Sequence, residues 1–176
     1  MRWSCAGREL DLSVPLIMGI VNVTPDSFSD GGEHAGCEQA IEFGLKLLEE
    51  GADILDIGGE STRPGAALVS AQGEIDRVIP VVKALAKSGA VISVDTSKAE
   101  VIKESIRAGA HIINDVRALQ EPGAMQAVAD SELGVCLMHM QGDPQTMQNR
   151  PHYKNMLEEV REFLLDRAHC AEKAGI

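Results

Sequence analysis

The sequence has few aromatic residues and no long hydrophobic run, and each absence excludes a class of protein. Aromatic side chains make up 3% of the 176 residues, so the core is expected to be aliphatic. No apolar stretch approaches the roughly 18 residues that a membrane-spanning helix needs. The first residues also lack the apolar segment of a secretory signal peptide. We therefore expect a cytoplasmic protein with no membrane partner.

Paired cysteines and an excess of positive charge are missing as well. The four cysteines form no CxxC pair, which argues against a zinc site or a thioredoxin-like motif. Cys136 lies in an apolar run and is predicted to be a small buried hydrophobic residue. The formal net charge of −11 disfavours nucleic acid as a partner, because phosphates require a basic surface. It does not exclude a small anionic ligand, since a few local groups can reverse the potential inside a cleft.

The sequence does contain a repeated order of apolar segment, polar loop and amphipathic helix. Strands are predicted at residues 16–23, 53–57, 91–95, 111–114 and 135–138. Helices are predicted at residues 37–50, 70–89, 97–109, 121–130 and around 157–168. The apolar strands alternate little, which is typical of parallel strands that are covered on both faces and joined by right-handed crossovers. Trp3 and Leu10 flank a turn-like segment, which predicts a short hairpin before the first of these strands.

Local signals predict how two of the helices begin. Ser70 is a candidate N-cap of the second helix, and Pro80 should remove one hydrogen bond inside it. Residues 97–100 match a capping box, in which Ser97 and Glu100 satisfy the first amides of the third helix.

Two architectures fit this order of elements. Five strands complete an open doubly wound sheet, whereas a (β/α)8 TIM barrel needs eight strands and about 250 residues. Length alone favours the open sheet. No linker interrupts residues 1–176, so a single domain is predicted.

Polar residues gather where the predicted strands end. In parallel α/β folds, this carboxyl-end edge of the sheet is where ligands bind. A single Asp or Asn there often caps a turn, but five such strand ends together indicate a site. The residues are Asn22, Asp56, Asp95, Asn114 with Asp115, and His139.

Two long loops add groups suited to anions and rings. Residues 24–32 carry Phe28, one of three phenylalanines. Residues 58–65 (GGESTRPG) offer backbone amides, two hydroxyls and the guanidinium of Arg63, which are groups that hold phosphate or carboxylate oxygens. The pattern is neither GxGxxG nor a Walker loop, so it does not predict a nucleotide.

Residues 18–32 and 56–65 resemble the two signature segments of the dihydropteroate synthase family. Residues 93–97, 112–116 and 138–142 are similar to that family's later strand ends, and the resemblance covers nearly the whole chain in order. It implies a pterin-binding (β/α)8 TIM barrel rather than an open sheet. The chain would then hold the first five βα units and an N-terminal hairpin, with the barrel incomplete.

The resemblance also implies an activity. Members of the family condense 6-hydroxymethyl-7,8-dihydropterin pyrophosphate with 4-aminobenzoate, which gives 7,8-dihydropteroate and pyrophosphate in folate biosynthesis. The family works with Mg²⁺, is a sulfonamide target and is usually a homodimer, so the full-length form is expected to be one.

Individual residues match positions with family roles, four of which we expect to be catalytic: Asn22, Thr62, Arg63 and Asp95. Asn22 matches the ligand for metal and pyrophosphate, and Thr62 matches a substrate-binding position. The pterin pocket would be lined by Asp95, Asn114 and the apolar wall Met138, and the aminobenzoate site by Phe28, Arg63 and Pro64.

The end of the sequence departs from the family pattern. The sixth strand of the family begins just beyond Ile176, so the chain is expected to be a single pterin-binding domain, truncated at its C-terminus and inactive alone. Five strands cannot close an eight-stranded barrel, and exposed edge strands promote association. Two alternatives stay open: an inactive homologue that only binds, and a pterin-barrel methyltetrahydrofolate methyltransferase. Residues 60–65 favour the synthase, because they suit a pyrophosphate-bearing substrate.

Overall fold

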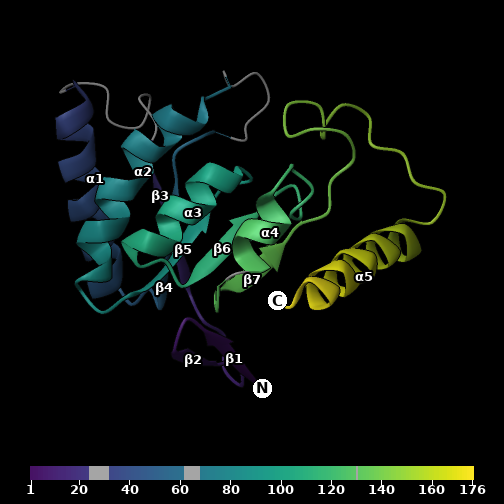
Figure 1. Cartoon of the computed structure of the whole chain (residues 1–176), viewed down its shortest axis with the longest axis horizontal. Helices are drawn as coiled ribbons and strands as arrows, with labels where there is room; N and C mark the ends of the chain where they lie inside the picture. The colour runs from purple at the N-terminus through teal and green to yellow at the C-terminus, as the bar shows by residue number, and fades with distance from the viewer. Residues whose placement is uncertain (24–31, 62–67, 130) are drawn as a thin grey trace.

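The computed structural model describes residues 1–23, 32–61, 68–129 and 131–176. Two short strands, β1 (Arg2–Cys5) and β2 (Arg8–Asp11), precede a series of alternating strands and helices (Figure 1). The strands of the series are β3 (Met18–Asn22), β4 (Ile54–Gly58), β5 (Val91–Asp95), β6 (Ile112–Asp115) and β7 (Gly134–Leu137). The helices are α1 (Gly32–Glu49), α2 (Ala71–Ala86), α3 (Ala99–Ala108), α4 (Ala124–Ala129) and α5 (Met156–Ala174). No described helix is both long enough and apolar enough to cross a membrane.

Strands β3 to β7 form one parallel sheet in which every strand pairs with the strand next to it in the chain. Each of the helices α1 to α4 packs against the next one in chain order, so the four lie side by side along one face of the sheet (Figure 1). A doubly wound sheet would instead reverse its strand order and carry helices on both faces. The described strands therefore wind as part of a barrel does, which confirms the barrel type over the open sheet.

The two faces of the sheet differ because side chains alternate along each strand. Val21, Ile57 and Val94 point to the helices and are completely buried there with the other members of the main apolar cluster. Residues one position away point to the opposite, inner face. The strand residues that carry chemistry lie on that face.

The N-terminal hairpin covers the lower end of the inner face. Its two turn residues, Ala6 and Gly7, have φ values of 47° and 75°, as a tight two-residue hairpin turn requires. Cys5 and Leu10 pack with Ile54 and Ile112 at the amino ends of their strands. The hairpin thus lies at the end of the sheet opposite the carboxyl ends (Figure 1).

The two predicted helix starts have different outcomes. Ser70 is the N-cap of α2, since its Oγ accepts from Gly73 N at 3.1 Å, and Pro80 lies inside the helix, as predicted. The capping box is wrong: α3 begins after Lys98, which makes no side-chain cap. Ser97 Oγ donates instead to Asp115 Oδ1 at 2.5 Å, because a buried carboxylate from the next strand is within reach.

Gly134 is in close contact with the indole ring of Trp3, and this contact generates a prediction. A Cβ at position 134 would lie 2.6 Å from Trp3 Cζ2, closer than unbonded carbon atoms approach. Gly134→Ala is therefore expected to lower the free energy of unfolding by about 1–3 kcal/mol, measured by urea denaturation followed by circular dichroism. In a Trp3→Leu background the same substitution should cost much less. An equal loss in both backgrounds would mean that the ring is not the obstacle.

Candidate functional site

One row of residues crosses the inner face of the sheet near the carboxyl ends of its strands. The parallel register aligns Asn22 with Gly58, Gly58 with Asp95, Asp95 with Asn114, and Asn114 with Cys136. Register neighbours in a sheet point to the same face. The structure therefore brings together three residues that the sequence placed at a ligand site: Asn22, Asp95 and Asn114.

Asp95 occupies the most unusual electrostatic position in this row. The pKa of Asp95 is raised to about 7, mainly by burial. Four nearby negative charges raise it further: Asp56, Glu74, Asp115 and Glu60. Asp95 lines a cavity of about 440 Å³ whose wall carries five carboxylates and two cationic side chains. Its carboxyl group therefore exchanges a proton near neutral pH. A hydrogen-bond donor that enters the cavity would stabilise the charged carboxylate.

Asp56 lies one inner-face position below Gly58 on β4. Its Oδ2 accepts a hydrogen bond from Asn114 Nδ2 at 3.0 Å, whereas its Oδ1 is buried and has no partner among the described residues. An unpaired buried acceptor costs about 1–3 kcal/mol, so a ligand N–H group would be stabilising there. The sequence placed Asp56 at a strand end without giving it a role. Asp56 is two residues before Gly58, so both lie on the same face of the strand. This spacing could have identified Asp56 as an inner-face residue.

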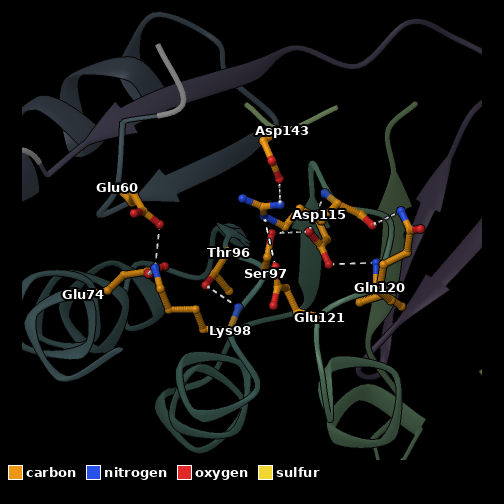
Figure 2. A network of polar contacts seen from close by, with 11 residues as sticks. Glu60, Glu74, Thr96, Ser97, Lys98, Asp115, Gln120, Glu121 and Asp143 are labelled. Atoms are coloured by element: carbon orange, nitrogen blue, oxygen red, sulfur yellow. Dashed lines mark hydrogen bonds and ion pairs between the residues drawn. The ribbon is translucent and has the colours of Figure 1, made fainter. Parts of the chain in front are cut away.

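Lys98 joins two acidic side chains beside this cavity (Figure 2). Its Nζ lies 2.5 Å from Glu60 Oε2 and 2.5 Å from Glu74 Oε2, and the Glu74 side chain is 1% exposed. Glu60 Oε1 also accepts from Val69 N at 2.8 Å. This group joins the end of β4, α2 and the start of α3. Sequence reasoning missed it, because Lys98 is 38 and 24 residues away from its partners.

Asp115 is a structural residue rather than a group presented to a ligand. Its carboxylate is fully buried and accepts from Ser97 Oγ, Arg117 N and Leu119 N (Figure 2). These bonds hold the turn after β6, in which Ala118 and Leu119 have φ values of 53° and 56°. Asp115 thereby connects the segment after Asp95 to the segment after Asn114.

The other residues to which the family resemblance assigned a role lie in two places. Met138 follows β7, is half-buried, and donates its amide to Asp115 O at 3.4 Å. Phe28, Thr62, Arg63 and Pro64 lie outside the described residues. Cys136 corrects a prediction: it is exposed rather than buried, because its position on β7 points to the inner face and not to the helices.

The described residues provide a limited set of metal ligands. They contain no group of three or more His, Cys, Asp and Glu side chains that could hold a metal ion. Asn22, at the end of β3, offers one amide oxygen on the inner face. Mg²⁺ often takes only one or two protein oxygens together with substrate phosphates and water, so Asn22 fits a shared site of that kind.

Comparison with known proteins gives consistent results. The family model for pterin-binding enzymes matches residues 18–176. The chain is 55% identical over 177 residues to the dihydropteroate synthase of Escherichia coli (strain K12), and the match covers 100% of this chain. It spans 63% of the length of that relative.

The solved structures similar to this one include two with bound ligands. A Yersinia pestis dihydropteroate synthase with a sulfonamide drug complex has a TM-score of 0.92 and 55% identity, over 100% of this chain and 64% of that chain. A Xanthomonas albilineans dihydropteroate synthase with 4-aminobenzoic acid has a TM-score of 0.90 and 55% identity, over 99% and 62%. The family match, the barrel-type winding and the polar row at the strand ends agree, and the chain belongs to the family of pterin-binding enzymes.

Proposed function

We propose that the protein is a dihydropteroate synthase. It would condense 6-hydroxymethyl-7,8-dihydropterin pyrophosphate with 4-aminobenzoate, and release 7,8-dihydropteroate and pyrophosphate. The observation that carries this proposal is the row of Asn22, Asp95 and Asn114 on the inner face. The similarity to synthases whose structures hold a sulfonamide drug and 4-aminobenzoic acid supports it.

The acidic inner face suits the edge of a pterin ring, which presents ring and exocyclic N–H donors. Asp95 is one acceptor, and Asp56 Oδ1, which has no partner in the described part of the chain, is another. The hydrogen bond from Asn114 fixes the Asp56 carboxylate. A ring without these donors would leave the buried acceptors unpaired, at about 1–3 kcal/mol each. The site thereby selects a heterocycle with a row of N–H groups.

The reaction breaks the bond between the pterin CH₂ carbon and the pyrophosphate oxygen, and forms a bond from that carbon to the amine of 4-aminobenzoate. The amine then loses a proton, so the product is a secondary amine. Conjugation with the pterin lets the CH₂ carbon carry positive character, which favours an SN1-like path. The neutral amine mainly needs to be positioned.

Mg²⁺ and the residues of the two loops complete the proposal. Bound Mg²⁺ would stabilise negative charge on the departing pyrophosphate, and Asn22 would supply one of its oxygen ligands. The family resemblance supports roles for Thr62 in substrate binding and for Phe28, Arg63 and Pro64 in the aminobenzoate site. It also supports an apolar wall at Met138, a homodimer and a cytoplasmic location.

Pyrophosphate release tests the proposed function directly. The protein, expressed from its whole gene, is incubated with both substrates and Mg²⁺, and pyrophosphate is measured with and without 4-aminobenzoate. We expect release that depends on 4-aminobenzoate. A protein that binds the pterin but releases no pyrophosphate would be a binding module and not a synthase.

Asp95→Asn should weaken pterin binding without unfolding the protein. Loss of the carboxylate removes a charged acceptor, so the Kd for the dihydropterin pyrophosphate should rise by about 10- to 100-fold in titration calorimetry. Asp143→Asn is the matched control: it removes a carboxylate from the same cavity wall, but one that pairs with Arg117. An unchanged Kd in Asp95→Asn would remove Asp95 from the binding site.

The same variant should change how stability depends on pH. The pKa of Asp95 is raised to about 7, so between pH 4 and 7 the folded state binds more protons than the unfolded state. Wild-type stability therefore falls as pH rises through this window, and the neutral amide of the Asp95→Asn variant cannot contribute to that fall. The Tm of Asp95→Asn relative to wild type should be higher at pH 8 than at pH 5. A Tm several degrees below wild type at both pH values would make Asp95 a structural residue.

Phe28→Ala tests the predicted role of the first loop. We expect the KM for 4-aminobenzoate to rise while the free energy of unfolding stays within about 0.5 kcal/mol of wild type. Steady-state kinetics with saturating pterin substrate and urea denaturation measure the two quantities. An unchanged KM would remove Phe28 from the aminobenzoate site.

A further inference from the structure

Gly58 is a glycine that neither its backbone nor its packing requires. It ends β4 in the middle of the polar row and is not among the described glycines with positive φ. A Cβ at this position would lie 3.6 Å from Asp95 Cβ, 3.7 Å from Asp95 Oδ2 and 3.9 Å from Asn22 Oδ1. These are ordinary contact distances, so the folded chain has room for a side chain here.

Other strand and loop glycines nearby have a packing reason. A Cβ at Gly59 would lie 2.6 Å from Val78 Cγ2, and one at Gly19 would lie 3.0 Å from Leu47 Cδ1. Glycine inside a strand is otherwise unfavourable, because it loses backbone entropy and packs no side chain. Where packing does not explain it, such a glycine often marks the close approach of a ligand to the backbone.

Gly58 is itself buried, and the position that a Cβ would take lies at contact distance from two functional groups, with a third close by on the same strand. Asn22 and Asp95 flank Gly58, and Asp56 lies one inner-face position below it on the same strand. The buried Oδ1 of Asp56 has no partner among the described residues. Carboxylates repel the anionic pyrophosphate and accept hydrogen bonds, so the surroundings suit the N–H edge of a planar ring.

We propose that Gly58 is a specificity-determining residue whose missing side chain leaves a slot for the N–H edge of the ligand ring. The ring edge lies against the β4 backbone between Asn22 and Asp95, and reaches the Asp56 oxygen that no described residue pairs with. A side chain at position 58 fills this slot. The inference rests on the proposed function, since it takes the pterin as the ligand.

The test compares two glycine substitutions on opposite faces of the sheet. Gly58→Ala should keep its Tm within about 2 °C of wild type, while the Kd for 6-hydroxymethyl-7,8-dihydropterin pyrophosphate rises about 10- to 100-fold. Gly58→Val should bind more weakly still. The matched control, Gly19→Ala, adds its methyl group against Leu47 on the helix side, so it should lower the Tm and leave the Kd unchanged.

A second ligand identifies what the slot accepts. 6-Hydroxymethyl-7,8-dihydropterin has the same ring without the pyrophosphate, and Gly58→Ala should weaken its binding by the same factor. A loss seen only with the pyrophosphate compound would overturn the assignment of the slot to the ring. A wild-type Kd in Gly58→Ala, or a Tm loss as large as that of Gly19→Ala, would also overturn it. If the wild-type protein binds neither compound, the proposed function is wrong, and so is the assignment of the pterin ring to the slot.

Discussion

The parallel register of β3 to β7 is the constraint on which the site depends. Because side chains alternate along each strand, this register gives the helices one set of residues and the inner face another. On the inner face, apolar residues at the amino ends pack against the hairpin, while the polar row lies at the carboxyl ends. A shift of one residue in the register of any strand would exchange its two faces. The residue that this strand contributes to the row would then point to the helices.

The charges around the row give the site its chemical character. Lys98 is shared by Glu60 and Glu74, and Arg117 pairs with Asp143, so both cations of the cavity wall are already engaged. Asp95 is left with negative neighbours, and its pKa is raised to about 7. The charged form of Asp95 thus lowers the stability of the folded state. A ligand that donates hydrogen bonds to Asp95 reduces this loss.

Sequence patterns predicted the strands well because those patterns are local. The predicted strand 91–95 agrees with β5, and 53–57 agrees with β4 to within one residue at each end. The predicted helix 121–130 is longer than α4, whose six residues follow a turn held by Asp115. Hydrophobic periodicity did not decide between barrel and open sheet, since both use the same βα unit. Only the resemblance of two loop segments favoured the barrel.

The parts of the site that could not be predicted depend on contacts between distant residues. Ser97 has the spacing of a capping residue, but its hydroxyl donates a hydrogen bond to a carboxylate 18 residues away instead. Cys136 lies in an apolar segment, yet the register of β7 points it to the inner face. The Lys98 ion pairs have no local signal at all.

The pKa of Asp95 is the most direct test, because every role proposed for the row assumes a carboxyl group that lies among negative charges and has no hydrogen-bond donor among the described residues. Carbon-13 NMR of the aspartate carboxyl groups, assigned with the Asp95→Asn variant, measures this pKa in the ligand-free protein and with 6-hydroxymethyl-7,8-dihydropterin. We expect a pKa of about 7 without ligand and a lower pKa with the ligand bound. A ligand-free pKa near the ordinary value of about 3.9, unchanged by the pterin, would contradict this expectation.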